Sequence, residues 1–289
     1  MKVSVIISLC NNRLEHFKRS LQTYTKQYID KKDFEILLID DAKRNEYIDL
    51  AQKAHNEMGL NIRYIRIDPA RGKYQPRSFT PALTNNVGFR KARGGVVAIT
   101  GPETLQAENN ISVASEMINR RECVYGLVFR ADKKFNKWID NNPLYLKLRF
   151  DHLLSGPGAK AECRTTPPHP PAYWYFMCVA KEYVEKIHGC DEKFLEGICG
   201  DDDDFSNRMK FAGVTPVFDH RIIGIHQDHS EGDQKDNSHS VRWKEDWERL
   251  RQINLNHMRE NIKSKDFIAN KNYEWGNQNV VLFEKEFVT

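Results

Sequence analysis

Short apolar segments alternate with amphipathic ones along the first part of the chain. The β-branched run 3–9 opens the sequence, and apolar residues recur at helical spacing over 13–28, which predicts a strand and then a helix. The same alternation predicts strands at 34–41, 61–67 and 96–100 and helices at 46–58 and 82–93. Short apolar strands that alternate with helices are typical of a parallel sheet covered on both faces.

The second half of the chain has a less regular pattern. The stretch 132–171 is rich in charge, Gly and Pro, which predicts surface loops around a cleft, and the polar segment 231–240 predicts a mobile loop. Trp243 and Trp247 begin an apolar pattern that indicates a closing helix. The other elements that we expect are helices at 111–120, 181–187 and 200–211 and strands at 123–130, 173–179, 214–218 and 280–283.

Composition restricts the class of protein. The 289 residues are 40% hydrophobic, enough for a sizeable core, and 44 basic against 40 acidic residues leave a formal charge of +4. So small a net charge gives no basic field for nucleic acid, so we expect no nucleic-acid partner. The apolar run 3–9 is too short to span a membrane, and the six scattered cysteines fit reduced thiols. We expect a cytoplasmic protein without a transmembrane segment, with the inner face of a membrane as an alternative location.

The residues that follow the strands are the first place to look for chemistry. In a parallel α/β sheet, ligands bind at the carboxyl ends of the strands. No GxGxxG follows the first strand and no GxxxxGK[ST] occurs in the sequence, so a dinucleotide fold or a P-loop is poorly supported. A different kind of nucleotide site is needed.

Four stretches resemble one known family. They are VSVIISLCNNRLEHFKRSL, EILLIDD, PALTNNVGFRKARGGVVAIT and YWYFMCVAKEYVEKIHGCDEKFLEGICGDDDDFSNRMKFAG. Together they resemble the family-two glycosyltransferases of GT-A fold, in the family's order. The resemblance implies an α/β protein with a mostly parallel central sheet. It does not cover about the last 60 residues, where the apolar pattern predicts a C-terminal helical extension. It divides the chain into a GT-A domain at 1–230, with a nucleotide-binding half at 1–105 and an acceptor and catalytic half at 106–230, and a polar loop and extension at 231–289.

The activity that this resemblance implies is an inverting sugar transfer. The donor would be a nucleotide-diphosphate sugar, with UDP favoured, and the acceptor a hydroxyl of a saccharide or glycoconjugate, as in polysaccharide biosynthesis. Two alternatives stay open. One is a catalytically impaired protein that binds carbohydrate or nucleotide, and the other is a sugar nucleotidyltransferase, which would need a Gly-rich loop that the stretch from Cys10 to Arg13 does not provide.

The resemblance also assigns residues to donor binding. Asp40 and Asp41 would receive the base and ribose, because a carboxylate at a strand end accepts hydrogen bonds from imide N–H groups and hydroxyls. Asn86 would hold a strand end or contact the nucleotide. Apart from the resemblance, the aromatic residues 173–175 suggest core packing with at most one side chain, Trp174 in our assignment, stacked on a sugar face. Arg71 and Lys73 would meet phosphates or stay solvated. The full set of expected donor-binding residues is Asn11, Arg13, Asp40, Asp41, Arg71, Lys73, Asn86, Trp174 and Asp204.

The metal motif of the family is altered in this chain. Gly101 stands in place of the first acid of Asp-x-Asp, and Glu103 stands at the second. A cation that bridges two phosphates needs few protein ligands, so Glu103 can still anchor Mn²⁺ or Mg²⁺. His226 or His229 would be a further ligand, and imidazole favours Mn²⁺. Ordinary surface histidines and the loss of metal dependence are the alternatives.

The four consecutive acids 201–204 are the sharpest feature of the sequence. Like charges at adjacent positions repel one another and raise the pKa values of some of the carboxyl groups. An ordinary solvated surface gives no reason for such a costly arrangement. By resemblance, Asp202 is the general base that deprotonates the acceptor hydroxyl. Asp201 and Asp204 would orient the acceptor or donor sugar. One base and direct displacement imply inversion at the anomeric carbon.

Overall fold

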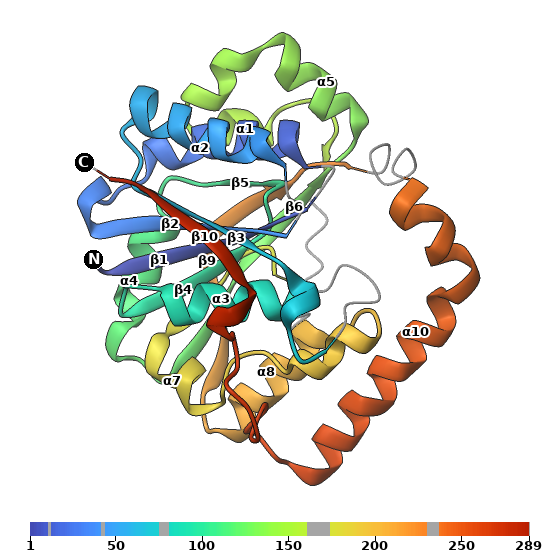
Figure 1. Cartoon of the computed structure of the whole chain (residues 1–289). Coiled ribbons are helices and arrows are strands. Elements are labelled where there is room, and N and C mark those ends of the chain that lie inside the picture. Colours follow the sequence, from blue (N-terminus) through green and yellow to red (C-terminus); the bar gives the residue numbers. More distant parts are fainter. Residues whose placement is uncertain (11–12, 42–43, 75–80, 161–173, 230–236, 289) are drawn as a thin grey trace.

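The computed structural model describes residues 1–10, 13–41, 44–74, 81–160, 174–229 and 237–288, with the backbone alone at 160, 237–245 and 278 (Figure 1). Asn11 and most of the expected loop 231–240 therefore lie outside the described residues. The remaining four positions of that loop are helical, because helix α10 begins at Asn237.

One large mixed sheet runs through the molecule, with helices on both of its faces (Figure 1). Its first half is the expected parallel arrangement, in which β3, β2, β1 and β4 lie side by side. Beyond β4 the pairing becomes mixed, since β8 is antiparallel to both β4 and β6 while β6 and β9 are parallel. In sheet order the strands are β10 (Val281–Phe287), β3 (Ile62–Ile67), β2 (Phe34–Asp40), β1 (Val3–Leu9), β4 (Val96–Thr100), β8 (Met177–Ala180), β6 (Glu122–Ala131), β9 (Thr215–His226) and β5 (Thr104–Gln106), with β7 (Ala159–Lys160) beside β6.

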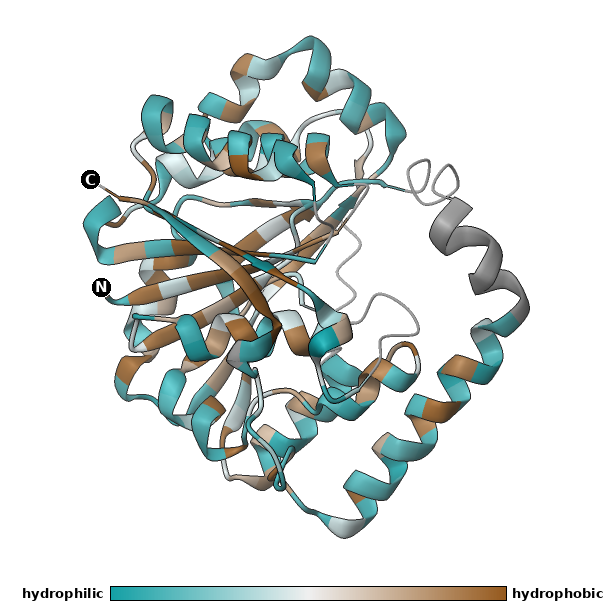
Figure 2. Cartoon of the chain, in the orientation of Figure 1, coloured by the Kyte–Doolittle hydropathy of each residue, from teal (hydrophilic) through white to brown (hydrophobic). Residues whose placement is uncertain are grey.

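Two apolar cores cover the two faces of this sheet. One is formed with the side chains of α1, α2 and α4, and the other with those of α3, α7 and α8. The β1 residues alternate between the two cores, because successive side chains of a strand point to opposite faces. Figure 2 shows the brown strands between mostly teal outer helices. The helices are α1 (Leu14–Thr23), α2 (Asn45–Met58), α3 (Ala82–Lys91), α4 (Asn110–Ser115), α7 (Lys181–Lys186) and α8 (Asp201–Phe211).

Gly88 sets how closely α3 packs on the sheet. A Cβ atom at this position would lie 2.5 Å from Cγ2 of Ile6 in β1, so only glycine permits the contact. The Asn-x-Gly stretch thus serves packing through its glycine, and α3 brings its first turn close to the end of β1.

The stretch 132–171 differs from the expected loops. Within its described part, α5 (Lys133–Asn141), a 3₁₀ turn (Pro143–Lys147) and α6 (Phe150–Leu154) form a small helical layer. Phe135, Ile139 and Leu153 in this layer pack with Leu105 and Ile225 in a third apolar core. The loop prediction was wrong because charged residues between these apolar positions concealed their helical spacing.

The C-terminal extension contains a long helix and a strand. Helix α10 (Asn237–Ser264) packs against α8, and β10 then pairs antiparallel with β3 at the edge of the sheet (Figure 1). The closing helix and the final strand are confirmed, although the strand is longer than expected. Within the described part of the chain, none of the helices combines the length and the apolar character that crossing a membrane requires.

Candidate active site

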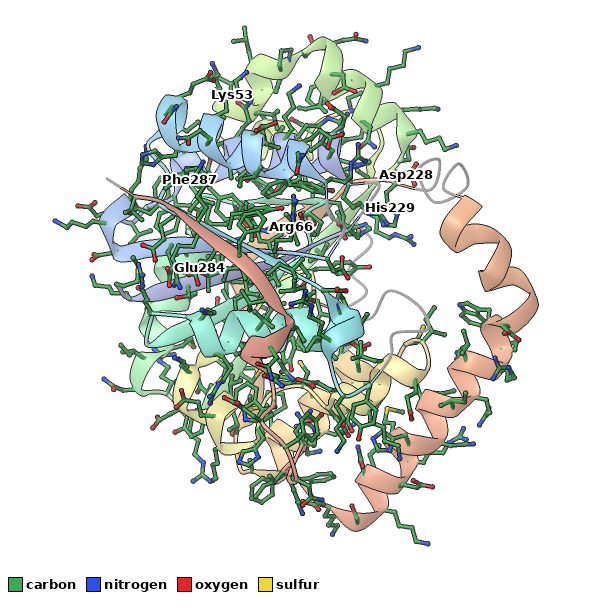
Figure 3. The ribbon with its side chains drawn as sticks, in the orientation of Figure 1. Lys53, Arg66, Asp228, His229, Glu284 and Phe287 are labelled. Atoms are coloured by element: carbon green, nitrogen blue, oxygen red, sulfur yellow. The ribbon has the colours of Figure 1, made fainter. Side chains whose placement is uncertain are left out.

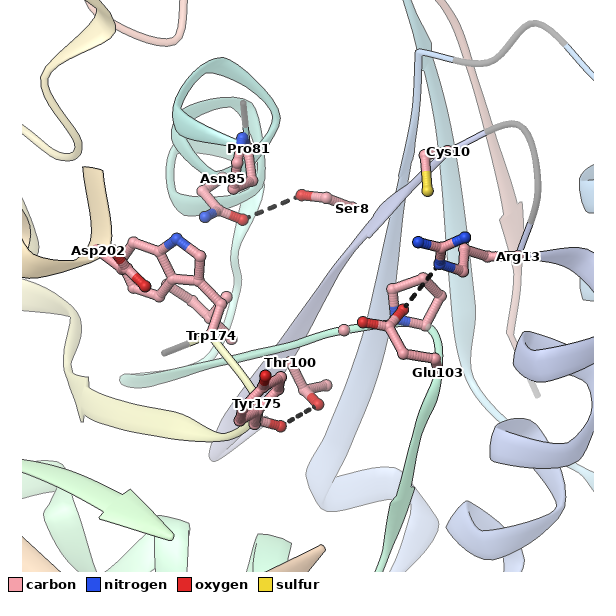
Figure 4. A pocket seen from close by; sticks show the side chains of 13 residues that line it. Ser8, Cys10, Arg13, Pro81, Asn85, Thr100, Glu103, Trp174, Tyr175 and Asp202 are labelled. Atoms are coloured by element: carbon pink, nitrogen blue, oxygen red, sulfur yellow. Dashed lines mark hydrogen bonds and ion pairs between the residues drawn. The ribbon is translucent and has the colours of Figure 1, made fainter. Parts of the chain in front are cut away.

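A cavity of about 250 Å³ opens at the carboxyl ends of β1 and β4 (Figure 4). This is the edge of the sheet at which the sequence predicts a ligand site. Two acids from distant parts of the chain, Glu103 and Asp202, line it together. The cavity wall consists of Ser8, Cys10, Arg13, Pro81, Asn85, Ile99, Thr100, Gly101, Pro102, Glu103, Trp174, Tyr175 and Asp202.

Glu103, His226 and His229 form a cluster beside the cavity. Each offers one ligand atom, and these atoms lie within 4.8 Å of one another. His226 Nε2 lies 3.3 Å from Glu103 Oε1, and the two histidine rings are 5.0 Å apart at their centroids. Figure 3 labels His229, which follows β9, near the end of that strand. The structure thus brings together the three residues that the sequence assigns to a metal.

Arg13 lies against the same cluster. Its Nε is 3.7 Å from Glu103 Oε2, and its Nη2 is 2.9 Å from His229 Nδ1. Burial opposes the ionised form of Glu103, but the hydrogen bond from His226 and the nearby positive charges outweigh it and lower the pKa of this carboxyl to about 2. Glu103 is therefore a carboxylate at neutral pH, which is the form that binds a cation.

Gln227 and Gly101 position this cluster. The Gln227 side chain donates to the carbonyl oxygens of His16 and Glu103 at 3.1 and 3.0 Å, so the two histidines on either side of it are held beside Glu103. A Cβ atom at Gly101 would lie only 2.6 Å from Glu103 Oε1. Gly101, which replaces the first acid of the metal motif, therefore leaves space that the Glu103 side chain occupies. Glutamate is longer than the aspartate of the motif.

The opposite wall of the cavity contains Asp202, at the start of α8. Its neighbour Asp201 is buried and accepts a hydrogen bond from Trp174 Nε1 at 3.2 Å. Burial raises the pKa of Asp201 to about 6. Burial, followed by the negative charges of Asp201 and Asp203, raises the pKa of Asp202 well above its ordinary value. Asp202 is therefore an unusually basic carboxylate in contact with the cavity.

Asn85 and Ser8 are polar wall residues to which the sequence assigned no role. The residue singled out in the helix of Asn85 was Asn86. Asn86 is fully buried elsewhere, where it donates to the Cys190 carbonyl at 2.9 Å and to Glu192 Oε1 at 2.8 Å. It holds the loop before α8 rather than a strand end. Adjacent helix positions differ by about 100° in direction, and this geometry separates the two asparagines.

Asp204 lies away from the cavity wall. Its carboxylate accepts from Arg208 Nε at 2.7 Å and from Asn261 Nδ2 at 2.9 Å, and its side chain is buried. Its i,i+4 spacing from Arg208 was a readable signal of this pair. In place of the expected role in orienting a sugar, Asp204 forms an ion pair within α8 and accepts a hydrogen bond from Asn261 that joins α8 to α10.

The remaining candidates are separate from the described cavity wall. Asp40 is fully buried and accepts a hydrogen bond from the Tyr64 hydroxyl, and Asp41 follows β2 directly. Arg71 is exposed and lies 3.7 Å from Asp68, while Lys73 lies 4.2 Å from the ring centre of Tyr273. The enclosed position of Asp40 is the main difference from the expected base-binding pair.

Comparisons with solved structures agree on the fold. S. aureus TarS superposes with a TM-score of 0.52 at 13% identity over 80% of this chain and 38% of that one. The mannosyltransferase PcManGT from Pyrobaculum calidifontis, solved with GDP-Man and Mn²⁺, gives 0.51 at 16% identity over 78% and 56%. GalNAc-T7, solved with UDP, GalNAc and Mn²⁺, gives 0.55 at 15% identity over 90% and 50%. This chain therefore spans between 38% and 56% of the length of these three proteins.

The α/β sheet and these superpositions define the fold of the chain as GT-A-like. The sequence model of Glycosyl transferase family 2 matches residues 4–156. The chain belongs to this family, as the sequence motifs indicate. Among proteins with curated descriptions, none matches the chain.

Proposed function

We propose that the protein transfers a sugar from a nucleotide-diphosphate donor to a hydroxyl of a saccharide or glycoconjugate, with inversion at the anomeric carbon. The observation that carries this proposal is the cavity that Glu103 and Asp202 line together. A cation-binding carboxylate and a strongly basic carboxylate on opposite walls match the two needs of the reaction, which are stabilisation of the departing diphosphate and deprotonation of the acceptor.

Mn²⁺ or Mg²⁺ would be held by Glu103, His226 and His229. One carboxylate and two imidazoles suit Mn²⁺ better than Mg²⁺, which prefers oxygen ligands and retains its waters. Two proteins of similar fold, PcManGT and GalNAc-T7, were solved with Mn²⁺, which supports this choice. When bound, the cation would supply positive charge for the diphosphate, and Arg13 would add a second positive group from the cavity wall.

Asp202 would act as the base and Asp201 would support it. The acceptor hydroxyl would lose its proton to Asp202 while its oxygen forms the new bond to the anomeric carbon. The bond from that carbon to the diphosphate oxygen would break, and the diphosphate would leave with the electron pair. A single displacement of this kind inverts the configuration. UDP is our favoured nucleotide, because TarS and GalNAc-T7 were solved with UDP, whereas PcManGT was solved with GDP-Man.

Ligand-induced stabilisation and transfer assays test this function. We expect UDP or GDP sugars with Mn²⁺ to raise the melting temperature of the whole chain, since a ligand at 100 times its Kd stabilises by about 2.7 kcal/mol. With saccharide acceptors, we expect release of nucleoside diphosphate and an inverted glycosidic bond by NMR. Binding without transfer would indicate the catalytically impaired alternative. Formation of a nucleotide sugar from a nucleoside triphosphate and a sugar phosphate would indicate the nucleotidyltransferase.

The metal assignment gives a separate prediction. In Glu103→Gln we expect the Kd for Mn²⁺ to rise at least about tenfold, because loss of even an outer partner of a ligand costs that much. Isothermal titration with Mn²⁺, with and without UDP, measures this change. Glu15→Gln on the exposed side of α1 is the matched control and should bind Mn²⁺ like the wild type. An unchanged Mn²⁺ affinity in Glu103→Gln would remove Glu103 from the site.

A further inference from the structure

One amide group in the cavity wall has an unfilled hydrogen-bonding position. Asn85 is fully buried, and its Oδ1 accepts a hydrogen bond from Ser8 Oγ at 3.0 Å. Its Nδ2 is buried too, yet it has no hydrogen-bond partner among the residues that the structure describes. A buried amide N–H group without a partner costs free energy, and such groups are rare in folded proteins.

The surroundings of Asn85 fix the direction of this free donor. Ser8 comes from β1, and its Oγ also lies 2.7 Å from Thr84 Oγ1, so its hydroxyl is enclosed between β1 and α3. The backbone N–H of Asn85 donates to the Pro81 carbonyl at 2.8 Å within the first turn of α3. In Figure 4, the amide oxygen of Asn85 faces Ser8, and its nitrogen lies on the side of Trp174 and Asp202.

The position of Asn85 along the cavity selects the part of the ligand that it would meet. Arg13 and Glu103 lie together on one wall, where a diphosphate and its cation would bind. Trp174 and Asp202 lie on the other wall, where the sugar and the incoming hydroxyl would meet (Figure 4). Asn85 is on this second side, so a sugar oxygen is the acceptor that its Nδ2 would reach.

We propose that Asn85 recognises the sugar of the nucleotide-sugar donor through a hydrogen bond from Nδ2 to a hydroxyl or N-acetyl carbonyl oxygen. This inference rests on the proposed function and specifies one of its contacts. A buried hydrogen-bond donor discriminates strongly between sugars, because a sugar that lacks the accepting oxygen leaves the amide N–H unpaired in the complex. Asn85 is thus a specificity-determining residue, whereas its neighbour Asn86 holds the loop at Cys190 and Glu192.

The test compares a nucleotide with its own sugar conjugate. Wild type, Asn85→Leu and Asn85→Ser are titrated with UDP, UDP-GlcNAc, GDP and GDP-Man in the presence of Mn²⁺. For the pair that the wild type binds, we expect Asn85→Leu to weaken the nucleotide sugar roughly tenfold, the effect of one lost hydrogen bond at a buried site, and to leave the nucleoside diphosphate within about twofold. Asn85→Ser, a smaller change that keeps a donor, should still bind the diphosphate if the leucine variant fails to fold.

The matched control is Asn56→Leu on the exposed face of α2, which should bind both ligands like the wild type. If the Asn85 variants bind the nucleotide and the nucleotide sugar with equally reduced affinity, the proposed contact with the sugar is wrong. The contact then belongs to the diphosphate or the nucleoside. Unchanged binding of both ligands would also overturn the proposal. These failures differ from failure of the proposed function, in which the wild type itself binds none of the four ligands.

Discussion

Asp202→Asn is expected to lower the rate of sugar transfer by about 10²- to 10⁴-fold, the usual contribution of a general base. The amide keeps the shape of the carboxylate but cannot take the proton of the acceptor hydroxyl. Donor binding should persist, because Glu103 and Arg13 lie on the opposite wall of the cavity. Single-turnover transfer and titration with the nucleotide sugar measure the two properties separately.

Asp203→Asn is the matched control for this prediction. Asp203 is adjacent in sequence and exposed, so the same substitution should leave most of the activity. It removes one of the charges that raise the pKa of Asp202, so a modest change is expected in the pH profile alone. Transfer that continues at the wild-type rate in Asp202→Asn would exclude this residue as the base.

The pH dependence follows from the same carboxylate. A base must be ionised to work, and burial together with Asp201 and Asp203 raises the pKa of Asp202 well above its ordinary value. The transfer rate should therefore fall as the pH decreases through this raised pKa, at a higher pH than for an exposed aspartate. Asp201→Asn removes a neighbouring negative charge, so it should move the midpoint of the profile to lower pH.

Much of the fold could be predicted because its strands are buried on both faces. The runs at β1 and β2 are apolar at five of their seven positions, and this is a local property of the sequence. The acid after β4 and the acids at the start of α8 could also be located, because each lies at the end of an element that the sequence predicts. Their convergence on one cavity is a tertiary fact that the sequence only implied through the resemblance.

The rest of the site depends on the rotation of helices, which composition does not specify. Asp202 and Asp204 are two residues apart in α8, so their side chains are separated by about 200° of rotation around the helix axis. One faces the cavity, and the other faces Arg208 and Asn261. Asn85 and Asn86 separate in the same way. The orphan amide of Asn85 could not be read from the sequence, because it depends on Ser8 occupying only one side of the group.

Asp204 and Arg208 form a buried ion pair within α8. Arg208 is 1% exposed, and its guanidinium also donates to the carbonyl oxygens of Ile187 and Gly189 at 3.2 and 2.8 Å. Asn261 of α10 donates to the same aspartate. The pair therefore joins α8, which carries Asp202, to the loop before it and to the long C-terminal helix.

Arg208→Met is expected to lower the free energy of unfolding by about 3–5 kcal/mol, because it leaves the Asp204 carboxylate buried without its cation. Urea unfolding monitored by circular dichroism measures this loss. Replacing both partners, as in Asp204→Leu with Arg208→Met, should recover much of it, because no buried charge remains unpaired. Arg249→Met, in an exposed pair with Asp246, is the matched control and should unfold like the wild type. Wild-type stability in Arg208→Met would contradict this role, since a buried carboxylate could not then depend on Arg208.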